Sequence, residues 1–348
     1  MSRGDLVTTE TIDETVTTSV DLAPAETWAV RWRRAQGRIR GFLGALIALV
    51  ILVVVLSVSQ STFLTVGNLR NVLVSNSSLF IVAVGMTCVL LSAGFDLSVG
   101  AIMAASEEAL YLLVHAGVPG GLAVVLVLLL GAAIGGIVNG VLIGVLRLNF
   151  FVVTLASMTL IYGLVDVITN GASEVINSGF LTSLGSGQVL GVPNSIAVMI
   201  AILVVIGVML RSTRFGRAIY GVGGNPEAAR LAGLPVSGVL VSVYAISGFC
   251  GALAGVMEAA RLVSATPTAG SSLALIGGAA VLLGGTSLFG GVGGVSGTVV
   301  GVLVIALLGN GVDLLGVSNY WQDVVTGAVL IGAIVLDWVQ RRGRGVGH

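Results

Sequence analysis

Five carboxylate side chains interrupt the apolar segments of this sequence, and they are the first candidates for chemistry. They are Asp96, Glu107, Glu108, Asp166 and Glu258. A charged group within hydrocarbon is costly, so by default it marks an ion or substrate pathway. None of the five has an obvious basic partner in the sequence. These residues are therefore the candidates for binding a solute or an ion.

Their surroundings indicate different roles. Asp96 lies in SAGFDLSVG, where Gly94 and Gly100 flank a turn, so we favour capping of the following helix over contact with substrate. Glu107 and Glu108 are about 100° apart on a helix, so both avoid lipid only if that helix is largely buried or its outer end is wet. Their role stays open. Asp166 and Glu258 lie near external helix ends, where exposure to water explains them.

Catalytic motifs are missing. The sequence has no HExxH, CxxC or GxSxG pattern, and His115 and His348 are isolated, so we expect neither an enzyme nor a metal or cofactor site. The phosphate-binding loop GxxxxGK[ST] needs a lysine, and all 16 basic residues are arginine. Energy from ATP must therefore come from another polypeptide. Cys88 and Cys250 lie in apolar runs, where we expect small buried side chains and no disulfide.

The composition places these residues in membrane helices. The chain is 56% hydrophobic and 9% charged, far from soluble composition. Its apolar runs are about 20 residues long, which is the length of a membrane span, and they are apolar on every face, unlike barrel strands. We predict an all-α integral membrane protein, a polytopic bundle of about ten transmembrane helices, some of them broken. The predicted spans are 42–58, 72–92, 97–116, 121–146, 150–168, 195–211, 237–262, 272–289, 295–311 and 320–339.

Arginine placement sets the orientation. With a cytoplasmic N-terminus, ten spans leave only Arg70 and Arg261 outside and the other arginines inside. Basic residues that flank spans stay cytoplasmic, so both termini are predicted to be cytoplasmic.

The predicted domain organisation has three parts. Residues 1–40 are a disordered cytoplasmic tail that ends in a basic juxtamembrane segment, because the Thr-rich acidic start has little apolar surface. Residues 41–340 are the transmembrane domain, whose first helix is an uncleaved anchor and not a signal peptide. Residues 341–348 are a cytoplasmic C-terminal tail.

Two loops are long enough to receive partners, an external one at 170–194 and a basic internal one at 211–236. The internal loop predicts a short helix that Asn225 caps, with Pro226 first, Glu227 in the first turn and Gly233 after its end. On its pattern alone this helix could lie on the membrane surface or dock on a partner.

The sequence contains 51 glycines, several at four-residue spacing, which predicts close helix packing. These are Gly131/Gly135, Gly136/Gly140/Gly144, Gly251/Gly255 and Gly293/Gly297/Gly301. The denser glycines between Gly277 and Gly301 predict broken helices within protein or against a cavity.

Six segments, in order, make the chain resemble the membrane permeases of bacterial ABC importers for monosaccharides, the ribose/xylose/galactose and autoinducer-2 group. They are LLSAGFDLSVGAIMA (90–104), NFFVVTLASMTLIYGL (149–164), TRFGRAIYGVGGNPEAARLAGLPV (213–236), TPTAG (266–270), VLLGGTSLFGGVG (281–293) and LLGVSNYWQDVVTGAVLIGAIVLD (314–337).

The resemblance implies a permease in the bacterial inner membrane that forms the pathway for a monosaccharide or similar solute. It implies as partners a second permease, as a homodimer, cytosolic ATPase subunits and an external sugar-binding protein, and no nucleic acid. It identifies the internal loop as an ATPase-coupling segment, with contact candidates Gly224, Asn225, Glu227, Ala228, Ala229, Gly233 and Leu234. In the matching segments, the candidates for the translocation pathway and its gate are Asp96, Ser98, Asn149, Phe150, Gly284, Gly285 and Thr286.

The chain departs from the family pattern in three places. After TPTAG it carries SSLALIGGAAV, without the acidic residues of a segment such as GYELDAIAAVV, and Asn149 is followed by Phe150 where the family usually has proline. The Glu107–Glu108 pair is not typical of the group. The alternative interpretation is an ion-coupled secondary transporter in which Asp96 or Glu107 carries the ion.

Overall fold

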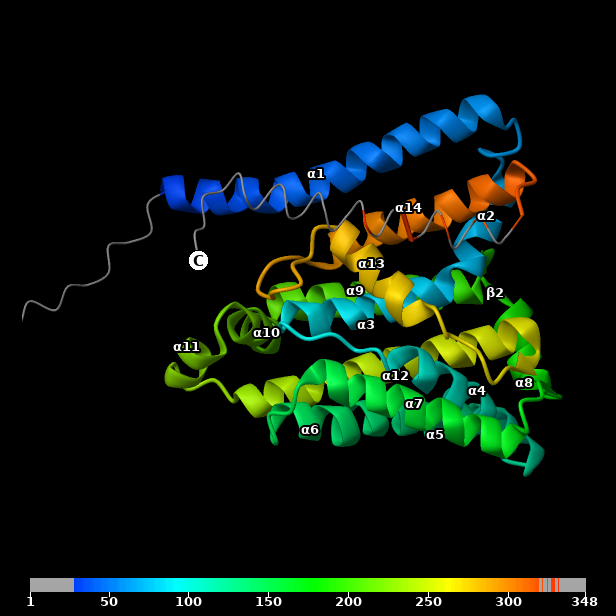
Figure 1. Cartoon of the computed structure of the whole chain (residues 1–348). Helices are drawn as coiled ribbons and strands as arrows, with labels where there is room; N and C mark the ends of the chain where they lie inside the picture. Colours follow the sequence, from blue (N-terminus) through cyan, green and yellow to red (C-terminus); the bar gives the residue numbers. More distant parts are fainter. Residues whose placement is uncertain (1–27, 319–320, 322–323, 325–326, 329–330, 332–348) are drawn as a thin grey trace, which may run out of the picture. The chain divides into compact units, whose positions relative to one another are not determined.

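The computed structural model describes residues 28–318 and the positions 321, 324, 327, 328 and 331, and these residues are almost entirely helical (Figure 1). The helices are α1 (Trp28–Ser59), α2 (Val66–Ser75), α3 (Ser77–Leu91), α4 (Val99–His115), α5 (Gly120–Ala133), the π-helix η1 (Ile134–Gly140), α6 (Val141–Gly144), α7 (Phe150–Thr169), α8 (Gly179–Ser186), α9 (Asn194–Ser212), α10 (Arg214–Gly224), α11 (Pro226–Leu231), α12 (Val236–Leu262), α13 (Leu273–Leu283) and α14 (Val295–Leu314). The strands are β1 (Glu174–Val175), β2 (Gln188–Val189), β3 (Val192–Pro193) and β4 (Ser264–Ala265).

Five helical segments in the described part of the chain are long and apolar enough to cross a membrane. They are Gly120–Gly144, which joins α5, η1 and α6, and the helices α7, α9, α12 and α14. A sixth span results if α2 and α3, which are bent by 50° relative to one another, are counted together. The predicted all-helical membrane protein is confirmed at this level.

Two predicted spans are interrupted. The span 72–92 is bent at Asn76, whose side-chain amide donates to the Val72 carbonyl and so competes with the helical hydrogen bonds. The span 272–289 contains only the 11 residues of α13, because Gly284 and Gly285 end the helix and Gly285 has φ +86°. The breaks predicted between Gly277 and Gly301 thus fall at residues 284–294.

The other predicted segments differ less from the observed helices and strands. The basic stretch 31–40 is helical, as the first part of α1. The span 97–116 corresponds to α4, with 17 residues. The loop predicted at 170–194 contains α8 and the strands β1, β2 and β3. The strand β1 pairs antiparallel with β4, and β2 pairs antiparallel with β3. The span 320–339 and the tails 1–27 and 341–348 lie outside the continuously described residues.

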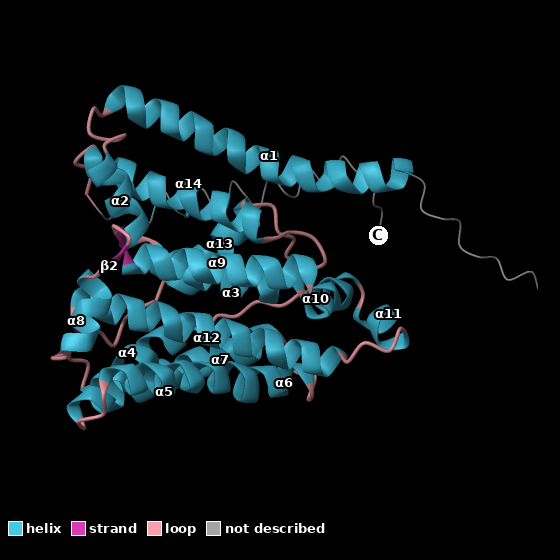
Figure 2. Ribbon diagram, turned by 180° about the vertical axis from the view of Figure 1, so that it is seen from behind, coloured by secondary structure: helices cyan, strands magenta, loops and turns pink. Residues whose placement is uncertain are grey.

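The helix α12 is the centre of the unit that begins at Arg38, and it packs against α3, α4, α5 and η1 (Figures 1 and 2). Every residue of α3 is buried, so this helix is apolar all round because protein surrounds it. By contrast, α5, α7 and α9 expose many large apolar side chains, among them Leu129, Val152 and Val205. Such a surface fits lipid or another apolar partner and not water.

Glycines allow the close approach at this centre. A Cβ on Gly135 would meet the Tyr244 carbonyl and the backbone of Gly248 on α12, and one on Gly140 would meet Val241. On the other side of α12, Gly251 and Gly255 face the backbone of α4. The small residues at four-residue spacing therefore form helix contacts, as predicted.

The bundle has two distinct ends. The helices α10 and α11 lie at one of them, called here the α11 end, and α8 with the strands lies at the other, the α8 end (Figures 1 and 2). The two loops that the sequence singled out therefore lie at opposite ends.

Candidate functional site

The short helix predicted in the internal loop is present at the α11 end. The Asn225 carboxamide oxygen accepts from the Ala228 amide at 2.9 Å, Pro226 is the first helical residue, and Gly233 ends the segment with φ +80°. These are the capping roles that the residue types predict.

The seven coupling candidates divide into an outer and an inner set. Gly224, Asn225, Glu227, Ala228 and Gly233 are exposed. Ala229 is buried in the hydrophobic core that α3, α9, α12, α13 and α14 share, called here the main core. Leu234 packs against the same core, so these two side chains anchor α11 instead of meeting a partner. The sequence candidates missed Leu231, whose side chain is 76% exposed. The helical spacing could have identified Leu231, because residue 231 lies about 200° from Ala229 and therefore on the opposite, outer face of the helix.

An ion pair lies on the exposed face of α11. Arg230 donates to the Glu227 carboxylate at 2.5 Å, and both side chains are more than half exposed. The hydrogen bond from Arg230 holds the pKa of Glu227 below its ordinary value, so the carboxylate stays charged at neutral pH. A partner would meet an apolar leucine beside a fixed pair of opposite charges.

The sequence did not predict α10. The Thr213 hydroxyl accepts from the Gly216 amide at 3.0 Å and caps it, and Ala218, Ile219 and Val222 turn inward. The sequence pattern that could have predicted α10 is the N-cap residue Thr213 followed by apolar residues at helical spacing.

The helix α10 joins α11 to the interior of the bundle. The Tyr220 hydroxyl donates to the Gly293 carbonyl at 2.9 Å. Gly223 lies directly on the Leu91 carbonyl, and the Gly291 amide donates to that same carbonyl at 2.9 Å. The helix α10 therefore contacts both the end of α3 and the glycine loop, residues 284–294.

Three gate candidates lie at the start of this glycine loop. Gly284 packs against the Gly297 backbone, Gly285 adopts its positive φ, and Thr286 is buried under Gly293. The Thr286 hydroxyl has no hydrogen-bond partner within the described residues. Together they form the tight connection between α13 and α14.

Asp96 and Ser98 belong to a buried polar network. One Asp96 oxygen accepts from the Ser98 amide at 2.9 Å and from its hydroxyl at 2.6 Å, and the other accepts from Ser247 on α12 at 2.7 Å. The Asn139 amide donates to Ser98 at 2.7 Å, and Ser157 on α7 donates to Asn139 at 2.6 Å. Asp96 thus orders the turn before α4 and links that turn to α12. It does not cap α4 as the preferred interpretation expected, because the N-cap residue is Ser98 and no side chain caps the amides of the first helical turn.

Sequence reasoning missed Asn139, Ser157 and Ser247. Asn139 lies in η1, and a π-helix turns side chains out of the regular helical register, so periodicity does not reveal it. Its partners are distant in sequence.

We expect Asp96→Ala to destabilise the protein by about 3 kcal/mol or more, because the Ser98 amide and two hydroxyls would lose a buried acceptor. Asp96→Asn keeps an acceptor oxygen and should cost clearly less. Thermal melting of the two variants in detergent checks this. Equal melting temperatures for Asp96→Ala and the unmodified chain would contradict the structural role.

The remaining pathway candidates lie elsewhere. Asn149 is exposed and caps α7, accepting from the Phe151 amide at 2.9 Å, while Phe150 packs against the main core. The predicted pathway residues therefore form separate groups: the turn before α4, the start of α7 and the glycine loop.

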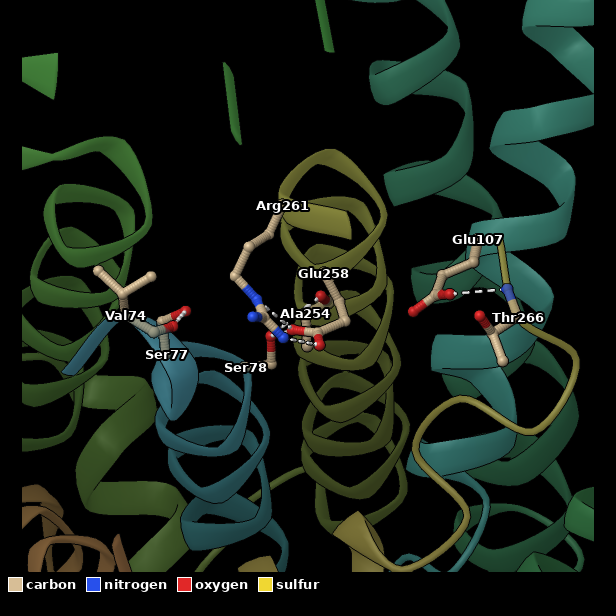
Figure 3. A network of polar contacts seen from close by, with 8 residues as sticks. All are labelled: Val74, Ser77, Ser78, Glu107, Ala254, Glu258, Arg261 and Thr266. Carbon is tan, nitrogen blue, oxygen red and sulfur yellow. Dashed lines mark hydrogen bonds and ion pairs between the residues drawn. The ribbon is translucent and has the colours of Figure 1, made fainter. Parts of the chain in front are cut away.

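A second polar cluster lies at the α8 end (Figure 3). The Thr266 amide donates to Glu107 at 3.1 Å, and Glu258 accepts from the Ser78 hydroxyl at 3.0 Å and forms an ion pair with Arg261. Arg261 is thus the basic partner that the sequence analysis did not assign to Glu258, although three-residue spacing on a helix permits it. Glu107 and Glu108 are both buried, because protein surrounds α4. In the described residues no group of three His, Cys, Asp or Glu side chains is placed to hold a metal ion.

The family described as branched-chain amino acid transport system / permease component matches residues 68–334. The chain belongs to this family. The match covers the α10–α11 segment and the glycine loop, and the permease prediction is confirmed. A permease of this kind is a component of an ABC transporter and not itself an enzyme.

Several curated relatives of this permease are named as sugar permeases. The ribose import permease protein RbsC of Escherichia coli K12 is 42% identical over 303 residues, which cover 84% of this chain and 92% of the relative. RbsC of Bacillus subtilis strain 168 is 43% identical over 302 residues, 85% and 92% of the two chains. The L-arabinose transport system permease protein AraH of E. coli K12 is 33% identical over 318 residues, 88% and 94%. No solved structure matches the chain.

Proposed function

We propose that this permease forms the import pathway for a monosaccharide, most simply a pentose, in an ABC importer of the inner membrane. The observation that carries the proposal is the α10–α11 segment, which presents an exposed helix at one end of the bundle and is bonded internally to α3 and the glycine loop. The sugar class follows from the relatives, whose names refer to ribose and L-arabinose.

The membrane topology is part of the proposal. About ten spans, with both termini and the α11 end in the cytoplasm, keep the arginines of residues 211–230 on the inner side. The tails 1–40 and 341–348 are then cytoplasmic and residues 41–340 form the transmembrane domain. The α8 end faces outward.

Partners follow from this orientation. A separate cytosolic ATPase subunit docks on α11, and an external sugar-binding protein docks at the α8 end. A second copy of the permease completes the pathway. It covers part of the apolar surface that this chain exposes.

In this mechanism α10 transmits the movement of the ATPase. Closure of the ATPase around ATP displaces α11, and α10 moves with it because the two helices are separated only by Asn225. Tyr220 and Gly223 pass the displacement to the glycine loop and the end of α3. The glycine loop connects α13 and α14, and a tightly packed connection of this kind can change from one packing arrangement to another. In the proposed mechanism this change opens the pathway toward the cytoplasm.

Gly223→Ala is expected to uncouple transport from ATP, because its Cβ would collide with the Leu91 carbonyl and separate α10 from α3. ATPase co-purification should persist while ATP-dependent sugar uptake falls by about tenfold, which lies within the range by which mutations between two sites change their coupling. Uptake by proteoliposomes measures it. Gly238→Ala, where a Cβ meets only Pro235 at 3.9 Å, is the matched control. Wild-type uptake by Gly223→Ala would contradict the role of α10.

A further inference from the structure

A cavity of about 400 Å³ opens near the α8 end, between α3, α4, α12 and α13. Part of its wall is polar, with Ser78, Glu107, Glu258 and Thr268, and part is apolar, with Met103 and Leu273. The cavity belongs to none of the pathway groups described above. Its volume is sufficient for one monosaccharide.

Glu107 is the residue of this cavity whose hydrogen-bonding capacity is not satisfied by the described residues. Its side chain is fully buried, yet only one of its oxygens is satisfied, by the Thr266 amide. The other oxygen, Oε1, has no partner within the described residues. Figure 3 shows the carboxyl group extending from α4 toward Glu258, which lines the same cavity. A buried acceptor without a donor is unfavourable unless something entering the site supplies one.

The other groups in the wall indicate what enters. Glu258 is already held by Ser78 and Arg261, so it offers an acceptor without an unbalanced charge. The Thr268 and Ser78 hydroxyls both donate and accept. Beside them, Met103 and Leu273 offer an apolar surface. Hydroxyls along one edge and C–H groups on one face are the features of a neutral sugar, whereas Arg261 disfavours a bare cation.

We infer that this cavity is a monosaccharide-binding site on the outward side of the permease, where Glu107 Oε1 accepts hydrogen bonds from sugar hydroxyls. The inference rests on the proposed function and adds a site to it. The permease itself then contributes to sugar recognition, before the solute reaches the gate. Residues 271–281 of this chain lack the acidic residues that the family pattern has after TPTAG. In this site the carboxylate is that of Glu107, on α4.

Glu107→Met tests the site in the complete importer, reconstituted with its ATPase and binding protein. The change removes an unpaired buried oxygen but also the acceptor of the Thr266 amide, so the two effects oppose each other and the melting temperature should change by no more than a few degrees. The KM for ribose uptake should nevertheless rise about tenfold, the effect of losing a hydrogen-bond acceptor in the binding site. Asp166→Asn changes an exposed carboxylate outside the cavity and should change KM less than about twofold.

Cysteine labelling gives a second, independent measurement. Both native cysteines, Cys88 and Cys250, are buried, so Thr268→Cys in the cavity wall offers a single exposed thiol. A membrane-impermeant maleimide should label it from outside, and ribose should slow the labelling. In the Glu107→Met background ribose should no longer protect.

The outcomes separate the two proposals. If the unmodified importer takes up no monosaccharide, the proposed function and this inference fail together. If it takes up ribose but Glu107→Met keeps the original KM and the original protection of Thr268→Cys, only the inference fails. Protection by sodium ions alone, without sugar, would also overturn it in favour of a cation site.

Discussion

Replacing Gly135 by leucine is expected to leave no folded permease in the membrane. A Cβ at this position of η1 would collide with the Tyr244 carbonyl and lie 3.0 Å from the Gly248 backbone, and α12 cannot yield locally because helices pack against it on several sides. Even Gly135→Ala should cost about 3 kcal/mol, the upper part of the range for overpacking. Expression level and size-exclusion profile in detergent measure the effect.

The matched control is Gly163→Ala on α7, where nothing lies within 4 Å of the added Cβ. This change should be neutral or stabilise the helix by about 0.5–1 kcal/mol, because alanine restricts the unfolded chain. If Gly135→Leu accumulates and elutes as the unmodified chain does, the close contact of η1 and α12 is not the one described.

The second large effect is expected at Leu231. Leu231→Asp places a charge where the docking proposal needs an apolar contact, beside the Glu227 carboxylate, and should weaken ATPase association about thirtyfold or more, the size of a hot-spot residue. Folding should not change, because the side chain is 76% exposed. Co-purification of the ATPase with a tagged permease is the measurement.

Leu190→Asp controls for a general effect of removing an exposed leucine, since Leu190 is 98% exposed at the α8 end. It should leave ATPase association intact. ATPase binding that survives Leu231→Asp, or that is lost equally with Leu190→Asp, would refute docking on α11.

The helical membrane fold and the α11 helix could be predicted because they depend on local signals. Apolar runs of span length need no tertiary information, and Asn225, Pro226 and Gly233 act within a few residues of their own positions. The same locality explains the correct expectation for the glycines. Four-residue spacing brings them onto one face whatever the partner helix is.

The errors arose where distant residues decide the structure. Ser247 donates to Asp96, Asn139 donates to Ser98, and Ser157 donates to Asn139, and no pattern along the chain relates these residues of separate helices. The span at 272–289 failed because hydropathy continues through Gly284 and Gly285, whereas the backbone turns there to pack on Gly297. The inward orientation of Ala229 likewise depends on the core beneath α11.

The most direct test of the central claim is sugar uptake into proteoliposomes that contain the permease, its ATPase subunit and the external binding protein. The proposed function predicts ribose or arabinose accumulation that requires ATP and all three components and that is indifferent to proton and sodium gradients. Uptake by the permease alone, driven by an ion gradient without the ATPase, would contradict it and favour ion-coupled transport through Asp96 or Glu107.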